Sequence, residues 1–366
     1  MHIALEDGFS IQKGTGIGQH TLNLYHQLRF YPEIESVELI PKPLISNIHP
    51  PFVRRAFYAV WINTILPIYL RKRKIDVIHF TNNLIPRCRS SNIKYVVTIH
   101  DMTPWQFPGT LPSRYLSYIK RAITHAVMNS DLILTVSKTI KDELISILNI
   151  EHKKIHVAYN GIAHDFWRVS TKTLDEINHL KSKFHLQKNF ILFVGVIEER
   201  KNIFTLLNAF EKIKKYKDIQ LVLVGRPGFG YTKIKQRMNN ILDKDDIIST
   251  GYVTLNELIG MYDAASIFIY PSLYEGFGIP LLEAMVRGTP IVASKIPTTL
   301  EIAGDAALYF DNADDDNALA DCIIKIIEQK SIRDTLIKRG KEQIRNFSWG
   351  KVGRMYLNAY QSLFNH

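Results

Sequence analysis

Hydrophobic residues recur along the chain in a pattern that predicts two successive domains of parallel strands joined by helices. Short apolar runs rich in β-branched residues alternate with longer segments of helical character. In the first half the predicted strands are Ile3–Leu5, Val37–Ile40, Val77–Phe80, Tyr95–Ile99, Leu132–Val136 and Ile155–Val157. In the second half they are Phe190–Gly195, Leu221–Gly225, Ile247–Thr250, Ile267–Tyr270 and Ile291–Ala293. We therefore expect an α/β protein with two doubly wound, Rossmann-like domains facing a central cleft.

A charged stretch with few strand signals, residues 168–188, interrupts this alternation and marks the expected domain boundary. We expect a first domain over residues 1–168 and a second over 169–346. The remaining residues, 347–366, contain a helical pattern from Trp349 to Phe364. A length of 366 residues suits two domains, because single domains commonly have about 100–200 residues.

The longest apolar stretch, Phe57–Leu70, is shorter than the roughly twenty residues that span a bilayer. It is interrupted by Asn63 and Thr64, and Pro67 lies near its end. We expect a buried helix here, and an interfacial helix is the alternative. Six cations bracket the stretch with no acid between them, namely Arg54, Arg55, Arg71, Lys72, Arg73 and Lys74.

The formal net charge is +11, of which residues 1–170 carry +8. This excess in the first half favours peripheral contact with an anionic membrane surface or a phosphate-bearing partner. Nucleic acid is another common partner of basic proteins. The sequence contains no zinc finger, basic-region helix or aromatic RNP motif, so we expect no nucleic-acid binding.

The two cysteines, Cys88 and Cys322, are far apart and lack metal-ligand spacing, which fits a reducing compartment. The first residues show no apolar run behind a basic start, so no signal peptide is expected. These features predict a cytoplasmic protein.

Three glycines, Gly14, Gly16 and Gly18, follow the first predicted strand and precede the helical pattern of His20–Leu28. Glycines allow close backbone approach, and free amides at a helix start attract phosphate. The spacing matches neither the dinucleotide fingerprint nor a P-loop. A tight turn without a ligand therefore remains the alternative.

Two further candidate groups stand where strands are predicted to end. His100 and Asp101 follow Tyr95–Ile99, and a histidine there can bind a sugar hydroxyl while the adjacent acid sets its orientation. Arg200 and Lys201 follow Phe190–Gly195 at a predicted helix start. Adjacent cations at such a position suit a diphosphate, although a solvated surface turn is the alternative.

The most specific segment joins Glu275 to Glu283 through Gly276, Phe277, Gly278 and Ile279. Pro280 suits the first turn of a helix, whose amides would then point at an anion. Glu275 can accept hydrogen bonds from sugar hydroxyls, and Glu283 can accept them from both hydroxyls of a ribose. The acids at 314–316 precede a helical pattern and are expected to cap a helix, so no metal is expected.

Taken together, these segments resemble glycosyltransferase family 4, a retaining family with the GT-B fold. The resemblance also includes Val136-Ser137, Tyr159-Asn160-Gly161-Ile162, the Thr289–Ser294 segment and the Glu301–Ala306 segment, so it covers nearly the whole chain. It implies a metal-independent transferase that uses a nucleotide sugar as substrate and needs no cofactor. It also implies a final helix that returns to the first domain.

The resemblance also implies roles for individual residues. Gly14, Gly16, Gly18 and Asp101 would lie at the donor, and His100 would contact the transferred sugar. Arg200 and Lys201 would neutralise the leaving diphosphate, assisted by the amides of Gly276–Ile279. Glu275 would bind the donor sugar, and Glu283 its ribose.

The finer resemblance is to bacterial transferases that build O-antigen and other polysaccharides, often mannosyl- or rhamnosyltransferases. It favours GDP-mannose as donor and a glycan or polyprenyl-diphosphate-linked acceptor at the inner face of the membrane. Rhamnosyl or glucosyl transfer from a dTDP- or UDP-sugar is an alternative. A nucleotide-sugar epimerase of the same fold and a non-catalytic polyanion-binding protein are alternatives of other classes.

Overall fold

The computed structural model describes residues 1–7, 16–40 and 51–364, and within 51–56 it describes a side chain only for Val53. The described chain divides into two compact units. The first comprises residues 1–105, 111–161 and 348–366, and the second comprises 106–110 and 162–347. In the described part of the chain no helix is long and apolar enough to cross a membrane.

The first unit is built on a parallel sheet with the strand order β2-β1-β3-β4-β5-β6. Its strands are β1 (His2–Glu6), β2 (Ser36–Leu39), β3 (Val77–Phe80), β4 (Lys94–Ile99), β5 (Leu132–Thr135) and β6 (Ile155–Val157). Its helices are α1 (Gly16–Leu28), α2 (Pro51–Lys72), α3 (Thr103–Gln106), α4 (Ser113–Asn129), α5 (Lys138–Leu148) and α15 (Trp349–Gln361), with the last residue of α3 in the second unit. The order reverses between β1 and β3, and ligands of open α/β sheets bind beside such a reversal.

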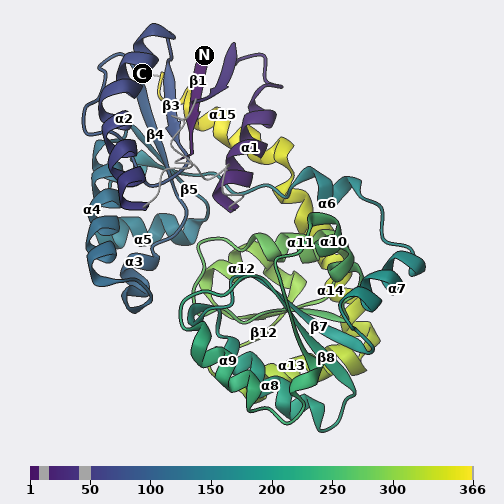
Figure 1. The fold of residues 1–366 in the computed structure, drawn as a ribbon. Coiled ribbons are helices and arrows are strands. Elements are labelled where there is room, and N and C mark those ends of the chain that lie inside the picture. Colours follow the sequence, from purple (N-terminus) through teal and green to yellow (C-terminus); the bar gives the residue numbers. More distant parts are fainter. Residues whose placement is uncertain (8–15, 41–50, 365–366) are drawn as a thin grey trace. The chain divides into compact units, whose positions relative to one another are not determined.

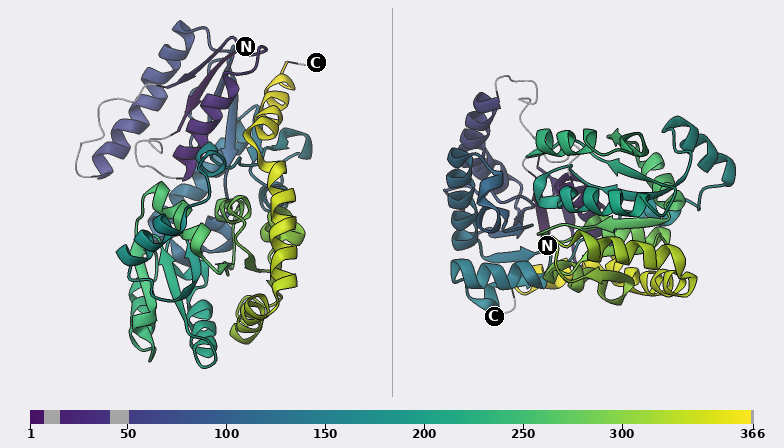
Figure 2. Two further views of the ribbon diagram at one scale, coloured as in Figure 1. Left: turned by 90° about the vertical axis from the view of Figure 1, so that its right-hand side faces the viewer. Right: turned by 90° about the horizontal axis from the view of Figure 1, so that it is seen from below.

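The last helix, α15, belongs to the first unit although the residues just before it belong to the second. It packs beside α1 over one face of the first sheet (Figures 1 and 2). Leu24 of α1 and Tyr356 of α15 are fully buried in one core with the sheet residues Ile3 and Val96. The end of the sequence therefore completes the core that its beginning forms.

The second unit contains a parallel sheet with the order β12-β11-β10-β7-β8-β9, which reverses between β7 and β10. Its strands are β7 (Asn189–Val194), β8 (Ile219–Val224), β9 (Ile247–Gly251), β10 (Ile267–Tyr270), β11 (Ile291–Ser294) and β12 (Ala307–Phe310). Its helices are α6 (His164–Arg168), α7 (Leu174–Lys183), α8 (Ile203–Lys214), α9 (Tyr231–Asn239), α10 (Leu255–Ala264), α11 (Ile279–Arg287), α12 (Pro297–Ala303), α13 (Asp316–Glu328) and α14 (Lys330–Gln343). Helices α8, α9 and α13 contribute to the core over one face of this sheet (Figure 1).

The predicted fold class is confirmed, since each predicted strand occurs within one or two residues of its expected bounds. One predicted cap is also confirmed, since Asp315 accepts the amide protons of Asn317 and Ala318 at the start of α13. The Ser137 hydroxyl similarly accepts the amide proton of Ile140 at the start of α5. Strand β12 was not predicted.

Two local predictions were wrong. Helix α1 begins at Gly16, so Gly16 and Gly18 lie in its first turn and not in a loop before it. The Phe57–Leu70 stretch is helical as part of α2, but it is not a buried helix. Leu66 and Leu70 are fully buried, whereas Phe57, Val60, Ile65 and Ile68 are each more than half exposed. The apolar composition of the segment did not reveal that only one side of the helix is covered.

Glycines hold the ends of β7 and β8 closer together than any side chain would permit. A Cβ atom on Gly225 would lie 1.8 Å from the carbonyl oxygen of Gly195, and Gly225 has φ +144°. The Gly225 amide donates to the carbonyl of Gly251, which extends the contact to β9. This close approach lies directly before the loops that follow β7 and β8.

We expect Gly225→Ala to lower the free energy of unfolding by about 2–3 kcal/mol, because the added methyl group forces backbone atoms apart. Chemical denaturation followed by circular dichroism measures the effect. Gly350→Ala in α15 is the matched control, because a Cβ atom there meets nothing within 4 Å. Equal stability of the two variants would show that the contact between Gly225 and Gly195 imposes no constraint.

Candidate active site

In the second unit the strand reversal between β7 and β10 brings two predicted groups together. Arg200 and Lys201 lie in a short 3-10 turn (Glu199–Lys201) that connects β7 to α8. Glu275 lies in the segment between β10 and α11. The side chains meet directly at the carboxyl ends of the two strands.

The contact is a buried group of three charges. Lys201 Nζ donates to Glu275 Oε1, and an Arg200 guanidinium nitrogen lies 3.3 Å from Glu275 Oε2. The exposed fractions of the Arg200, Lys201 and Glu275 side chains are 17%, 12% and 9%. Burial of this extent argues against the alternative of a solvated surface turn.

Two further acceptors fix the Arg200 guanidinium. It donates to the Tyr274 carbonyl oxygen at 2.7 Å and to Glu198 Oε1 at 2.7 Å. A planar guanidinium held at several positions presents its remaining N–H groups in a defined direction. The turn therefore contributes an oriented cation as well as a positive charge.

Glu275 is ionised in this environment. Burial alone would raise the pKa of its carboxyl group, but Lys201 and Arg200 outweigh that effect and the pKa lies at about 2. The carboxylate balances one of the two cations, and Glu198, which forms an ion pair with Arg200, balances the other. Its lone pairs also make it an acceptor for hydroxyl groups.

The segment between Glu275 and α11 has a backbone conformation that suits contact between its amide groups and a ligand. Gly278 is the N-cap of α11 with φ +110°, and a Cβ atom there would lie 3.0 Å from Leu281 Cδ1. The Phe277 ring is buried and packs edge-on against Phe347, so its side chain anchors the segment. Ile279 begins the helix and Gly276 precedes this turn. The first amides of a helix are suited to an anion.

Glu283 lies in the second turn of α11, and Glu283 Oε2 accepts a hydrogen bond from the Tyr262 hydroxyl at 2.8 Å. Burial raises the pKa of Glu283 to about 7, and the bond from Tyr262 opposes that rise. The two predicted glutamates thus differ in charge state near neutral pH. Glu275 is ionised, whereas Glu283 is poised between its two forms.

The acids at 314–316 lie at the start of α13, where they make structural contacts. Asp315 is its N-cap, and Asp316 forms an ion pair with Lys212 of α8. Asn202, directly after Lys201, donates to the Ala313 carbonyl oxygen and accepts from Thr205. These bonds hold the Arg200–Lys201 turn against the loop before α13.

In the first unit the strand reversal lies between β1 and β3, and the predicted glycines are close to it in sequence. Gly14 lies outside the described residues. A Cβ atom on Gly16 would meet no atom of the described residues within 4 Å, so they leave the space beside this helical turn open. Gly18 is buried beneath it. The open side at Gly16 leaves room for close approach of a ligand to the helix start.

His100 follows β4 and is oriented by the end of β3. Its Nε2 atom donates to the Thr81 carbonyl oxygen at 2.8 Å. Burial lowers the pKa of His100, while the bond to Thr81 and the charge of Asp101 oppose this shift. A neutral ring protonated at Nε2 leaves Nδ1 as a hydrogen-bond acceptor.

Asp101 does not orient His100, contrary to the prediction. Its Oδ1 atom accepts the amide proton of Thr103 instead and so caps the short helix α3. The carbonyl group of Thr81 provides the orientation. Thr81 is itself tied to α1, because its hydroxyl shares a 2.6 Å hydrogen bond with that of Thr21.

Sequence reasoning missed two buried histidines near His100. The His20 ring lies edge-on to that of His100 with centroids 5.6 Å apart, and His20 Nε2 bonds to the Tyr356 hydroxyl at 3.2 Å. His79 lies between the hydroxyl groups of Tyr360 and Thr98. Burial lowers the pKa of His79 to about 3 and that of His20 well below its ordinary value. Both rings are therefore neutral.

Two acids at the end of β1 were also missed. Glu6 and Asp7 are almost fully buried, and Glu6 Oε2 accepts a hydrogen bond from Asn82 after β3. A pair of acids directly after a buried strand was a signal that the sequence offered. The aromatic partners of the histidines offered none, because they lie more than 280 residues away along the chain.

Comparison with known proteins agrees with this two-part arrangement. Residues 16–166 match the family model described as Glycosyltransferase Family 4, and residues 175–343 match the model described as Glycosyl transferases group 1. The chain is 29% identical to O-antigen chain mannosyltransferase B of Escherichia coli, over 95% of this chain and 96% of that protein. It is 28% identical to the O-antigen chain mannosyltransferase RfbU of Salmonella typhimurium strain LT2, over 87% and 88% of the two chains.

Solved structures show the same fold over the full length. The crystal structure of Anabaena Alr3699/HepE in complex with UDP and glucose matches with a TM-score of 0.76 at 15% identity, over 99% of this chain and all of that one. The two parallel sheets and the neighbouring structures agree on a GT-B fold. The chain is therefore a glycosyltransferase that combines a Glycosyltransferase Family 4 domain in its first half with a group 1 glycosyltransferase domain in its second half.

Proposed function

We propose that this glycosyltransferase is a retaining, metal-independent mannosyltransferase that uses GDP-mannose to extend a saccharide or polyprenyl-diphosphate-linked acceptor in O-antigen or polysaccharide assembly. The observation that carries this proposal is the buried group of Arg200, Lys201 and Glu275 at the β7–β10 reversal. Two fixed cations and a carboxylate at the carboxyl ends of these strands support the proposal, because open α/β sheets bind nucleotides there.

The two cations suit a leaving diphosphate. When the bond between the anomeric carbon and the phosphate oxygen breaks, negative charge develops on that oxygen. Oriented cations in a site of low water content stabilise such charge without reorganising. Arg200 and Lys201 would supply the positive charge that a divalent ion supplies in other transferases, and the first amides of α11 would add to it.

Retention follows if the acceptor attacks the face that the diphosphate leaves. The acceptor hydroxyl oxygen forms the new bond to the anomeric carbon, and its proton passes to the departing phosphate oxygen. Such a step needs no separate general base. His79 and His100 are neutral imidazoles of lowered pKa, which suits binding of hydroxyl groups better than removal of their protons.

His100 and Glu275 would bind the transferred sugar. His100 offers Nδ1 as an acceptor because its Nε2 proton is engaged by Thr81. Glu275 offers an ionised carboxylate. Gly16, Gly18 and Asp101 would approach the donor on the same unit as His100, and Glu283 would accept the ribose hydroxyls.

Mannose and the polysaccharide pathway are supported by the two O-antigen mannosyltransferases that align along most of this chain. We place the reaction at the cytoplasmic face of the membrane, with peripheral contact to anionic lipid. The charge of +8 on residues 1–170 supports that contact.

Nucleotide binding tests the basic pair and the donor base together. In thermal-shift assays without metal and with EDTA, we expect GDP to stabilise the protein more than UDP, dTDP or ADP. Lys201→Ala should weaken GDP binding about 10- to 100-fold, because a charge-assisted hydrogen bond to phosphate is lost. Lys338→Ala, at an exposed lysine of α14, is the control. Equal GDP binding by the two variants would refute the diphosphate assignment.

The raised pKa of Glu283 predicts pH-dependent donor binding. Below pH 7 the carboxyl group is mostly protonated and accepts hydroxyl groups less well, so the dissociation constant for GDP should rise about tenfold from pH 8 to pH 6. Isothermal titration calorimetry measures this change. Tyr262→Phe should move the transition to higher pH, because the tyrosine bond lowers the pKa of Glu283. Glu283→Gln should bind weakly and without this transition; an unchanged pH profile would exclude Glu283 from the site.

Product analysis tests retention and metal independence. With GDP-mannose and a mannose-terminated acceptor in EDTA, we expect transfer with the anomeric configuration of the donor, observed by proton NMR. Inverted product would overturn the proposed chemistry. Conversion of the donor sugar without an acceptor would indicate an epimerase.

A further inference from the structure

Helix α2 exposes an apolar side that no other part of the described first unit covers. Phe57, Val60, Ile65 and Ile68 are 53%, 60%, 55% and 55% exposed. The opposite side of the helix is buried in the unit through residues such as Leu66 and Leu70. Exposed apolar side chains gathered on one helix indicate a surface that meets another apolar phase.

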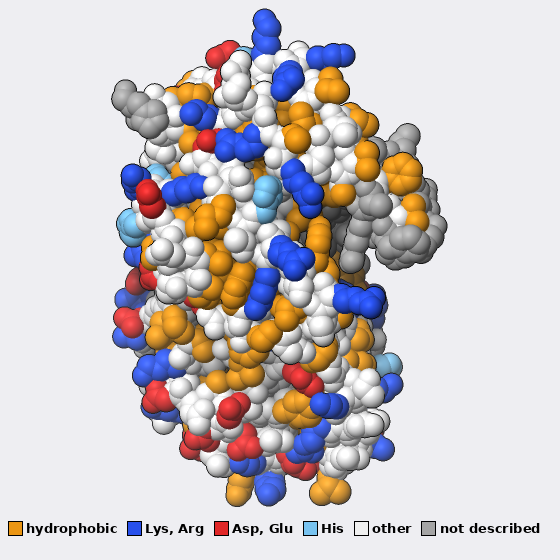
Figure 3. Space-filling view, turned by 90° about the vertical axis from the view of Figure 1, so that its left-hand side faces the viewer, with side chains coloured by type: hydrophobic (Ala, Val, Ile, Leu, Met, Phe, Trp, Pro, Cys, Tyr) orange, Lys and Arg blue, Asp and Glu red, His pale blue; other side chains and the backbone are white. Residues whose placement is uncertain are grey.

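Beside this helix side lies a groove of about 1170 Å³ between α2, residues 84–88 and α4. Val60, Leu84 and Tyr118 contribute apolar surface to it, and among the described residues no Asp or Glu lines it. Three arginines also line it, namely Arg87, Arg114 and Arg121. Figure 3 shows hydrophobic and basic side chains interspersed over the side of the molecule that carries α2 and α4.

The three guanidinium groups are available for an external anion. Among the described residues, none of them has an ion pair or a side-chain hydrogen bond. All three residues are exposed. The backbone amide of Arg87 donates to Asn63 Oδ1 of α2 at 2.6 Å, so the position of Arg87 beside the helix is fixed.

The described cations that bracket the apolar stretch in the sequence lie outside this groove, and two of them have contacts of their own. Arg71 donates to the Ser90 hydroxyl, and Arg73 lies over the Tyr69 ring and 4.0 Å from Glu38. The side chains of Arg54 and Arg55 lie outside the described part. Lys72 and Lys74 are exposed and their side chains have no ion pair or hydrogen bond within the described part of the chain, so they remain candidates for anion binding beside the three arginines of the groove.

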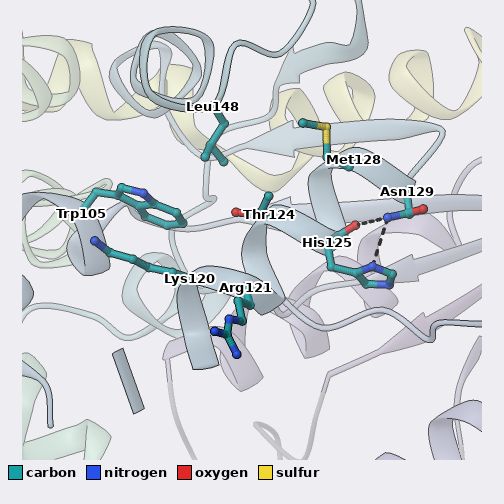
Figure 4. Close-up of a pocket in the computed structure, with 8 residues that line it drawn as sticks. All are labelled: Trp105, Lys120, Arg121, Thr124, His125, Met128, Asn129 and Leu148. Carbon is teal, nitrogen blue, oxygen red and sulfur yellow. Dashed lines mark hydrogen bonds between the residues drawn. The ribbon is translucent and has the colours of Figure 1, made fainter. Parts of the chain in front are cut away.

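A smaller neighbouring pocket is less suited to an anion (Figure 4). Lys120 lies there over the Trp105 ring, 5.5 Å from its centroid. His125 bonds to Asn129 on its own helix and to the Pro86 carbonyl oxygen. Lys120 and His125 are thus engaged within the protein, and Arg121, which also lines the larger groove, is the one described arginine that the two pockets share.

We propose that the α2–α4 face, defined by the exposed apolar side of α2 and the groove with its three arginines, docks this transferase on an anionic phospholipid bilayer. The apolar side chains of α2 enter the interface, and the arginines bind lipid phosphates. This inference rests on the proposed function, because docking brings the enzyme to a lipid-linked acceptor. The absence of acids from the groove favours lipid over a protein partner, whose surface would carry both signs of charge.

Vesicle flotation at low salt tests this proposal with the full chain. We expect binding to vesicles of phosphatidylglycerol and phosphatidylethanolamine, and little binding to phosphatidylcholine alone. The triple variant R87S/R114S/R121S should reduce the partition coefficient about 100-fold, since each cation near an anionic surface contributes about fivefold. The control K338S/K341S/R345S removes three exposed cations of the second unit and should bind like the native protein.

A second variant separates apolar insertion from net charge. V60S/I65S/I68S keeps every cation and changes only exposed side chains, so it should fold normally and still lose at least about tenfold in binding. If the arginine triple variant and the control triple variant lost vesicle binding equally, binding would depend only on the net charge of the protein, and the proposal would be overturned. Flotation that requires added undecaprenyl phosphate would also overturn it, because the groove would then be an acceptor site.

The nucleotide assay distinguishes this failure from failure of the proposed function. All three triple variants should show the native thermal shift with GDP, because their substitutions lie outside the residues assigned to the donor. Loss of lipid binding with intact GDP binding supports the docking face. Native flotation of the R87S/R114S/R121S variant with intact GDP binding refutes the docking face and leaves the transferase assignment standing.

Discussion

The arrangement of the second unit depends on a carboxylate that is buried with two cations. A buried charge is unfavourable unless it is paired and hydrogen-bonded. Glu275 meets this requirement only because Arg200 and Lys201 approach it from the neighbouring strand. The loops after β7 and β10 therefore constrain each other, and the cations are held in position before any ligand arrives.

Glycines make this mutual constraint possible. A Cβ atom on Gly228 would lie 2.9 Å from Glu198 Cβ, and one on Gly230 would lie 2.4 Å from Glu199 Cγ. The loop after β8 is thus packed directly on the two acids that precede Arg200. Because Glu198 in turn accepts from the Arg200 guanidinium, backbone packing in one loop determines where a cation of the next loop points. Preorganisation of this kind is what stabilisation of a leaving diphosphate requires.

From the sequence, the fold and the residue types of the candidate site could be predicted more accurately than the contacts between residues far apart in the chain. Buried parallel strands appear as apolar runs between turn signals, so β1 to β11 were found. Strand β12 was missed because its four residues directly follow the 3-10 turn Gly304–Ala306 and its two middle residues are only partly buried. The exposed side of α2 was missed because apolar residues occur on both sides of that helix, and composition alone does not show which side a protein covers.

The two units differ in the kind of polar surface that surrounds their candidate residues. In the second unit, opposite charges are concentrated and keep Glu275 ionised. In the first unit, burial disfavours the protonated forms of His20, His79 and His100. A positive charge on His100 would further lower the pKa values of His20 and His79.

Helix α15 favours the uncharged state of His20 and His79, because Tyr356 and Tyr360 give them hydrogen-bond partners that carry no opposite charge. The Tyr356 hydroxyl also donates to the Ala158 carbonyl oxygen, which leaves its oxygen to accept from His20. The return of the chain end to the first sheet thus has a chemical consequence: it supplies uncharged partners to His20 and His79, so the two imidazoles near His100 remain neutral.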